Sequence, residues 1–142
     1  MNVEAVLSGK GRSVITIDEA LTVQAAARVL DEHGIGAVVV VDTAERPVAI
    51  LSERDIVREL ALNGSAILNR PVSNIMTQAF ITADLSDALD DLMVLMTDRR
   101  VRHLPVMNDG VLAGIVSIGD VVKAKISDVE AEADAIKGYI LS

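Results

Sequence analysis

Hydrophobic and polar residues along the first half of the chain alternate between two kinds of pattern. Short apolar runs predict three strands, at residues 14–17, 37–41 and 48–51. Between the first two runs, residues 23–31 place their apolar side chains at helical spacing, which predicts an amphipathic helix. A second helix is expected to begin near Ser52. The pattern therefore predicts the order strand, helix, strand, strand, helix.

Polar residues and glycines at the ends of the first predicted helix set its limits. Thr22 is suited to cap the first turn, and Gly34 supplies the left-handed conformation that ends a helix. We interpret Gly34-Ile35-Gly36 as this helix stop and not as a dinucleotide-binding loop, because a third glycine is absent and the segment follows a helix. His33 lies in the last turn, where the helix dipole favours a cation.

The same order of elements returns in the second half of the chain. Residues 50–57 (ILSERDIV) reappear 65 residues later as residues 115–122 (IVSIGDVV). The pattern predicts strands at residues 80–82, 101–107 and 111–116, with a helix over residues 87–97. Asn108-Asp109-Gly110 predicts a tight hairpin turn between the last two strands.

A lead-in segment is also duplicated, as residues 3–7 before the first copy and residues 72–76 before the second. We therefore divide the chain into a first repeat, a linker, a second repeat and a C-terminal helix, at residues 3–60, 61–71, 72–124 and 125–142. A single copy has too little core to be secure alone, so we expect the two to pack face to face as one domain with approximate twofold symmetry.

The C-terminal segment carries an apolar stripe that lies outside the repeats. Its members recur at alternating steps of four and three residues, as in a coiled coil: Val122, Ile126, Val129, Ala133, Ile136 and Ile140. We expect this stripe to form a contact between two copies of the chain. Docking of the stripe on the chain's own repeats is the alternative.

Composition and charge exclude several classes of function. The 142 residues include no cysteine, and 13 basic against 21 acidic side chains give a net charge of −8. A polyanion is repelled by such a surface, so nucleic acid is not an expected partner. The longest apolar run, Ala37–Val41, is far shorter than the ~20 residues of a membrane span, and no export signal is visible. These features fit a cytoplasmic protein without membrane contact.

Three segments of the second copy resemble the cystathionine β-synthase (CBS) domain family: residues 72–77 (VSNIMT), 101–106 (VRHLPV) and 114–120 (GIVSIGD). The resemblance covers residues 3 to about 124 in two copies. The first copy departs from it twice, with Val40 in place of Pro105 and Ala49 in place of Gly114. We therefore expect two sites that are alike in kind and unequal in strength.

The resemblance implies a fold and a class of ligand. The fold is of the α/β (α+β) class, with two β-α-β-β-α repeats packed with pseudo-twofold symmetry into one disc-like module. The C-terminal amphipathic helix is added to it. The clefts between such repeats typically bind adenine-containing ligands: AMP, ADP, ATP, NAD(H) or S-adenosylmethionine. The Asp of the Ser-x-x-Asp segment holds the ribose hydroxyls, and the discs commonly pair as homodimers.

The chemistry of the two Ser-x-x-Asp segments fits that role. An ionised carboxylate has two oxygens that can accept hydrogen bonds from adjacent ribose hydroxyls, so Asp55 and Asp120 are the candidate ribose ligands. Ser52 and Ser117, at helix starts, offer a hydroxyl beside unpaired N–H groups that favour phosphate. The alternative interpretation is a capping box, in which each pair only satisfies the start of its helix. Both roles are compatible.

Further candidates surround these two pairs. For phosphate we select Arg54, Arg102 and His103, whereas Arg99 and Arg100 are equally explained as surface residues. With one Phe and one Tyr in the chain, adenine must be walled by aliphatic side chains and recognised by backbone groups. The candidate residues for this wall lie in the apolar runs: Thr16, Ala37, Thr82, His103, Leu104 and Pro105.

Catalytic chemistry is not expected. Two histidines far apart in sequence and no cysteine argue against a zinc site, and no Ser/His/Asp arrangement is suggested by spacing. We therefore expect no catalytic residue and no metal ligand. The leading hypothesis is a regulatory module that senses an adenine nucleotide and reports its presence to a separate, unknown protein. The alternatives are a structural or interaction protein whose pockets have lapsed, and a small enzyme.

Overall fold

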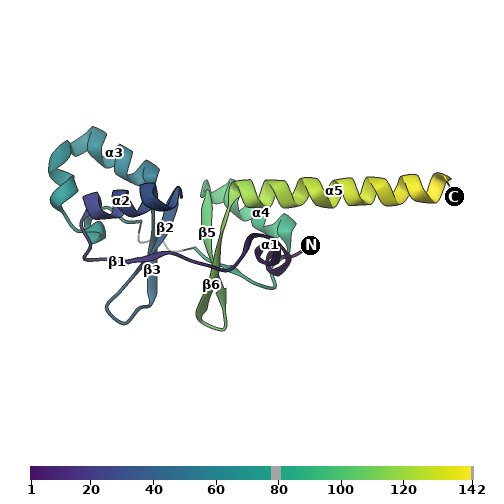
Figure 1. Ribbon diagram of the computed structural model, residues 1–142, viewed down its shortest axis with the longest axis horizontal. Helices are drawn as coiled ribbons and strands as arrows, with labels where there is room; N and C mark the ends of the chain where they lie inside the picture. The colour runs from purple at the N-terminus through teal and green to yellow at the C-terminus, as the bar shows by residue number, and fades with distance from the viewer. Residues whose placement is uncertain (78–80, 142) are drawn as a thin grey trace. The chain divides into compact units, whose positions relative to one another are not determined.

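The computed structural model describes residues 1–77 and 81–141 (Figure 1). Its contacts divide the chain into two units, each with its own three-stranded sheet. We call Ser13–Ile81 the first-repeat unit, and Met1–Arg12 together with Thr82–Ser142 the second-repeat unit. The class is α/β, with five α-helices and two three-stranded sheets in the described residues.

The first-repeat unit follows the predicted order. Its elements are β1 (Thr16–Asp18), α2 (Val23–His33), β2 (Ala37–Val41), β3 (Pro47–Ser52), α3 (Glu53–Asn63) and the 3₁₀ turns η1 (Ser65–Asn69) and η2 (Val72–Asn74). In the sheet, β2 is central, parallel to β1 and antiparallel to β3. Val38 and Val40 of β2 share one core with the buried face of α2. Residues 37–40 of β2 are all buried, which explains its continuous apolar run, because a strand buried on both faces needs no polar face.

The limits of α2 are as predicted. The Thr22 hydroxyl accepts a hydrogen bond from the Ala25 N–H at 3.2 Å, which caps the helix. Gly34 ends it in the left-handed conformation, with φ 61° and ψ 37°. His33 Nδ1 lies 2.9 Å from the Val29 carbonyl, so this histidine serves the helix end, as expected.

The second-repeat unit has the same sheet topology. Its elements are α1 (Val3–Lys10), β4 (Ala83–Asp84), α4 (Leu89–Arg99), β5 (His103–Asn108), β6 (Val111–Ser117) and α5 (Ile118–Leu141). The central strand β5 is parallel to β4 and antiparallel to β6. Asp109 and Gly110 both have positive φ, 50° and 79°, which confirms the tight hairpin turn.

Several predicted boundaries were wrong by two or three residues; the strand expected from residue 101, for example, begins at His103. The strand expected at residues 80–82 lies at Ala83–Asp84 (β4), because these are the described residues of the segment that pair with β5. Phe80 lies outside the described residues. The helix expected to begin at residue 87 begins at Leu89, because the Asp87 carboxylate accepts the Asp84 N–H at 2.9 Å and holds a turn there. In the other unit, the strand expected from residue 14 begins at Thr16.

Each lead-in segment pairs with the repeat that it does not directly precede in the chain. The N–H groups of Val3 and Glu4 donate to the carbonyls of Asp87 and Leu85, both at 3.0 Å. In the other unit, Val72 and Ser73 donate to Leu21 and Glu19, at 2.8 and 3.0 Å. The two sets of contacts are equivalent, so α1 belongs to the second-repeat unit and η2 to the first-repeat unit.

Helix α5 is one continuous helix that begins directly after β6. In Figure 1 its C-terminal part projects beyond the rest of its own unit. Val121 is buried, but the stripe residues Val122, Ile126 and Ile136 are 41%, 54% and 60% exposed. In the described residues, the stripe is therefore exposed and is not docked on the chain's own repeats.

The length of α5 does not make it a membrane span. Charged side chains interrupt its apolar residues, and no helix in residues 1–77 and 81–141 is both long and apolar enough to cross a bilayer.

Candidate functional site

The first Ser-Asp corner, formed by Ser52 and Asp55, lies where β3 leads into α3. The Ser52 N–H donates to Asp55 Oδ2 at 2.9 Å, and the Asp55 N–H donates to Ser52 Oγ at 3.2 Å. These reciprocal bonds are a capping box, so the capping interpretation is confirmed. Asp55 is only 8% exposed, which is unusual for a carboxylate and is tolerated because both of its oxygens accept hydrogen bonds.

The second bond to Asp55 comes from its own helix. Arg58 Nη2 donates to Asp55 Oδ1 at 2.8 Å, one turn further along α3. Within the described residues, each carboxylate oxygen of Asp55 therefore accepts one hydrogen bond, from Ser52 at Oδ2 and from Arg58 at Oδ1. Since a carboxylate offers about four acceptor positions, each oxygen retains capacity for one more donor.

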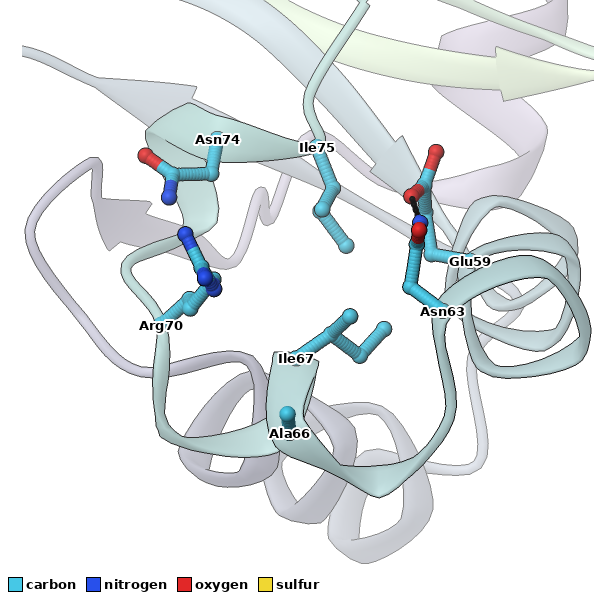
Figure 2. Close-up of a pocket in the computed structure, with 7 residues that line it drawn as sticks. All are labelled: Glu59, Asn63, Ala66, Ile67, Arg70, Asn74 and Ile75. Atoms are coloured by element: carbon cyan, nitrogen blue, oxygen red, sulfur yellow. Dashed lines mark hydrogen bonds between the residues drawn. The ribbon is translucent and has the colours of Figure 1, made fainter.

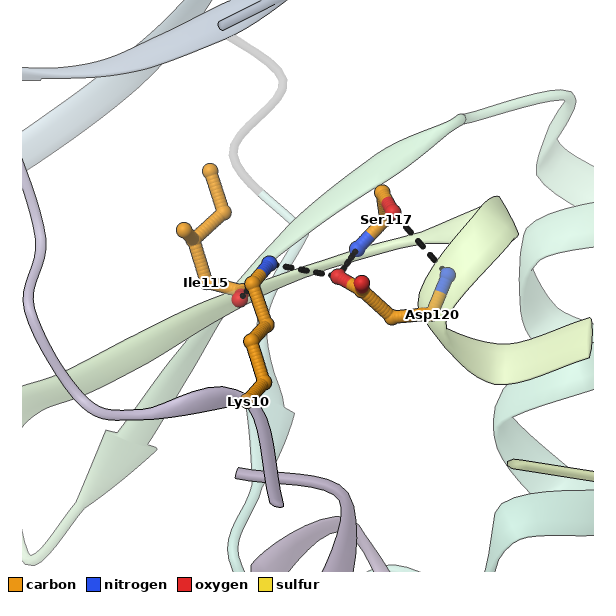
Figure 3. A network of polar contacts seen from close by, with 4 residues as sticks. All are labelled: Lys10, Ile115, Ser117 and Asp120. Carbon is orange, nitrogen blue, oxygen red and sulfur yellow. Dashed lines mark hydrogen bonds and ion pairs between the residues drawn. The ribbon is translucent and has the colours of Figure 1, made fainter. Parts of the chain in front are cut away.

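The second Ser-Asp corner, formed by Ser117 and Asp120, lies where β6 leads into α5 (Figure 3). The Ser117 N–H donates to Asp120 Oδ2 at 2.9 Å, and the Asp120 N–H donates to Ser117 Oγ at 3.1 Å. The capping geometry is thus the same as in the first corner.

The cation at the second corner comes from a distant part of the chain. Lys10, the last residue of α1, donates from Nζ to Asp120 Oδ2 and, at 2.9 Å, to the carbonyl of Ile115 (Figure 3). Within the described residues, Asp120 Oδ1 accepts no hydrogen bond, whereas Oδ2 accepts two. The charge at this corner is therefore concentrated on one oxygen.

Burial raises the pKa of the Asp120 carboxyl, but hydrogen bonds from Lys10 and Ser117 outweigh burial, so the net pKa lies below the ordinary aspartate value. Asp120 is therefore ionised at neutral pH, which is the form that accepts hydrogen bonds from hydroxyl groups.

Packing of α1 on β6 explains how Lys10 reaches Asp120. Leu7 of α1 is fully buried, and a Cβ added at Gly114 of β6 would lie 2.8 Å from Leu7 Cδ1. The glycine therefore leaves room for the helix to approach the strand. The first repeat has Ala49 at the equivalent position, and this alanine shares one core with Val72 and Ile75 of the lead-in segment that belongs to its unit.

The other predicted residues of the first-repeat unit lie at the same end of its sheet. Ala37, which begins β2, is the Cα partner of Ser52, and Thr16 begins β1. Ala37 is 6% exposed, so its backbone and not its side chain is available to a ligand, whereas Thr16 is exposed. Arg54 is exposed on α3, and no hydrogen bond or ion pair joins its side chain to the described residues.

The second-repeat unit gathers its predicted residues in the same way. His103 is the Cα partner of Ser117, and the Arg102 carbonyl accepts the Ile118 N–H at 2.8 Å. The Arg102 side chain is exposed, and Thr82 is exposed before β4. Leu104 and Pro105 are buried in β5, so a ligand would meet at most their backbone.

Two charged residues of these corners were missed by the sequence interpretation. Arg58 lies three residues after Asp55, and this helical spacing was a usable signal. Lys123 has the same spacing from Asp120, yet it forms no ion pair with the described residues, and Lys10 takes that place. No local pattern identifies Lys10, because 110 residues separate it from Asp120.

A separate cavity lies at the other end of α3, in the first-repeat unit (Figure 2). Its volume is about 550 Å³, and none of the predicted site residues lines it. In Figure 2, Arg70 and Asn74 lie along one wall, opposite Glu59 and Asn63, which are hydrogen-bonded at 2.8 Å. The cavity is therefore distinct from the first Ser-Asp corner.

Comparisons with known proteins agree with this geometry. The family model of the CBS domain matches residues 10–62 and 72–127. The CBS domain-containing protein CBSX3, mitochondrial, of Arabidopsis thaliana is 35% identical over 95% of this chain and 69% of its own length. The crystal structure of the CBS-domain containing protein ATU1752 from Agrobacterium tumefaciens is 44% identical, with a TM-score of 0.84 over 87% of this chain and 92% of that one.

Two further solved structures contain ligands. The CBS domain pair of protein MJ0100, in complex with 5′-methylthioadenosine and S-adenosyl-L-methionine, is 26% identical, with a TM-score of 0.79 over 90% of this chain and 98% of that one. The CBS domain protein PAE2072 from Pyrobaculum aerophilum, complexed with AMP, is 29% identical, with a TM-score of 0.76 over 84% and 89%. Sequence, topology and solved relatives lead to one conclusion: the chain belongs to the CBS domain family.

Proposed function

We propose that this protein is a regulatory module that binds adenine-containing ligands at its two Ser-Asp corners. The observation that carries the proposal is the duplication of one charged geometry. In both units an aspartate in the first turn of a helix is held by the backbone N–H of a serine at the end of a strand, at 2.9 Å. A capping role alone does not require this pair twice at equivalent ends of two sheets.

The chemistry of the corners fits a ribose. Two adjacent hydroxyls donate to two carboxylate oxygens, and hydrogen bonds to a charged acceptor are stronger than neutral ones. The helix N-terminus beside each aspartate favours a phosphate. AMP, ADP, ATP, NAD(H) and S-adenosylmethionine all share the adenosine unit. The complexes of the solved relatives with AMP, 5′-methylthioadenosine and S-adenosyl-L-methionine support this class of ligand.

Calorimetric titration with AMP, ATP, NADH and S-adenosylmethionine tests the proposal. We expect at least one ligand to bind, and Asp55→Asn and Asp120→Asn each to weaken binding at their own corner by about 10-fold or more. Asp91→Asn, an exposed acid of α4 outside both corners, is the control and should bind as the original protein does. A protein that binds none of these ligands, or binds them unchanged in both corner variants, would instead support a structural or interaction role.

The proposed role is binding without turnover, in the cytoplasm, with a separate protein as the regulated target. Chromatography of the nucleotide after long incubation should recover it intact. Appearance of a hydrolysed or transferred product would contradict a non-catalytic role.

We also propose that α5 joins two copies of the chain. The exposed stripe alternates steps of four and three residues, which is the seam of a left-handed coiled coil. In a parallel, in-register pair, Glu132 lies beside the stripe and faces Lys137 of the second copy, and Lys125 faces Glu130 in the same way. Both pairings join opposite charges. This complementarity favours a second copy of α5 over an unrelated partner.

Light scattering on a sizing column tests this contact. Ile136→Glu places a charge in the seam on the projecting part of α5, where the side chain is 60% exposed and the unit's own fold does not depend on it. We expect the mass to fall to that of one chain. Ala131→Glu, on the outer face of the same helix, is the matched control and should keep the mass of the original protein. A monomeric original protein, or an unchanged mass in the Ile136 variant, would contradict the contact.

A further inference from the structure

Lys10 and Asp120 are paired in a way that a bound ribose would have to disturb. Asp120 Oδ2 already accepts the Ser117 N–H at 2.9 Å and the Lys10 ammonium, whereas Oδ1 accepts nothing from the described residues. A carboxylate oxygen has two acceptor positions, so Oδ2 is filled. A pair of ribose hydroxyls can therefore use both oxygens only if Lys10 leaves Oδ2.

Lys10 is placed to make that exchange. Its side chain is 35% exposed at the end of α1, and within the described residues its ammonium is held by Asp120 and by the Ile115 carbonyl alone. A lysine ammonium on a flexible stem reorients more readily than a guanidinium fork. The released ammonium loses its hydrogen bond to the Asp120 carboxylate, and a neutral ligand supplies no anion to replace that partner. A 5′-phosphate on the same ribose does supply one.

The first Ser-Asp corner lacks this conflict. Arg58 contacts Asp55 Oδ1 at 2.8 Å and Ser52 contacts Oδ2, so one acceptor position remains on each oxygen. A ribose can be accepted there without breaking the ion pair. The two corners therefore differ in whether their cation competes with the ligand.

We propose that Lys10 makes the second Ser-Asp corner selective for adenine ligands with a 5′-phosphate over adenine ligands without one. Without a ligand, Lys10 is paired with Asp120. When ribose hydroxyls bind Asp120 and displace the Lys10 ammonium, the ammonium binds the 5′-phosphate of the same ligand. This inference rests on the proposed function and adds the class of ligand. It separates AMP, ADP, ATP and NAD(H) from the uncharged ligands adenosine and 5′-methylthioadenosine at this corner.

The test compares AMP with adenosine by calorimetry in an Asp55→Asn background, which leaves the second corner as the site under study. Three further variants are compared: Lys10→Met, Lys10→Arg and, as the matched control, Lys123→Met. Lys123 is an exposed lysine three residues after Asp120 that forms no ion pair with the described part of the chain. We expect Lys10→Met to weaken AMP binding by about 10-fold or more and to leave adenosine binding equal or tighter.

Lys10→Arg should keep most of the preference for AMP, and Lys123→Met all of it. A Lys10→Met variant that weakens both ligands equally, or neither, would overturn the role of Lys10 while leaving adenine binding intact. If neither ligand binds before Lys10 is changed, in this background or with Asp55 intact, the proposed function fails together with this inference. Because Lys10 is exposed, its variants are expected to fold, and their thermal midpoints verify this directly.

Discussion

The two Ser-Asp corners share one sequence motif and differ in the origin of their cation. At the first corner, Arg58 comes from the same helix as Asp55. At the second, Lys10 comes from α1, 110 residues away, although Lys123 has the local spacing of Arg58. The contrast shows that two copies of one sequence motif can form sites whose charged neighbours differ. The Arg58–Asp55 pair requires only helix α3, whereas the Lys10–Asp120 pair also requires α1 to pack beside β6.

The largest expected effect comes from removing the side chain that anchors α1. Leu7 is fully buried, so Leu7→Ala should lower the free energy of unfolding by about 2–5 kcal/mol. Leu62→Ala, at a 71% exposed position of α3, is the matched control and should change it by less than about 0.5 kcal/mol. Urea titration followed by circular dichroism measures both. Equal effects of the two changes would contradict the anchoring role of Leu7.

Filling the space between α1 and β6 should have the next largest effect. Gly114→Ala brings a methyl group within 2.8 Å of buried Leu7, so we expect a loss of about 1–3 kcal/mol. Ala49→Gly makes the opposite change at the equivalent position of the first repeat and should cost about 0.5–1 kcal/mol through backbone entropy. Thermal unfolding of both variants compares them. A Gly114→Ala variant as stable as the original would show that α1 does not need the glycine.

Removal of each capping hydroxyl should have nearly equal effects at the two corners. Ser52 and Ser117 accept the same kind of bond, at 3.2 and 3.1 Å. We therefore expect Ser52→Ala and Ser117→Ala each to lower the unfolding free energy by about 1 kcal/mol. Chemical denaturation of the two variants side by side provides the measurement. A difference larger than the effect itself would mean that the corners differ in capping as well as in their cations.

The smallest effect concerns the Lys10–Asp120 ion pair and its dependence on pH. The pKa of Asp120 is lowered in the folded state, so the pair stabilises the fold above the aspartate's unfolded pKa and loses its effect as the pH falls through the folded value. Lys10→Met should cost at most about 1 kcal/mol at pH 7, because both side chains are partly exposed. The gap between original and variant should close as the pH falls below about 4.

Urea titrations of the original protein and the Lys10→Met variant at pH 7 and pH 3 measure that gap. Lys123→Met, at an exposed lysine that forms no ion pair with the described residues, serves as the control for a surface lysine. A gap that stays constant or widens toward low pH would show that Lys10 does not act through Asp120.

Much of the fold could be predicted from local pattern. The strand at Ala37–Val41, the cap at Thr22, the stop at Gly34 and the turn at Asp109-Gly110 all follow from side-chain periodicity or backbone preference, which act within a few residues. The boundaries missed at β4 and α4 depend on pairing with β5 and on the Asp87 turn. Both are contacts between segments, which local pattern does not report.

The sequence by itself determined the two repeats, their order of elements and the two Ser-Asp pairs, because a duplication preserves local chemistry at matching positions. Only the tertiary structure decided which lead-in belongs to which repeat, since Val3 and Val72 are equivalent in sequence and the chain's order favours the wrong pairing. That exchange places α1 against Gly114 and Lys10 against Asp120. Packing over a long separation in the chain, and not the motif, is what makes the two corners different.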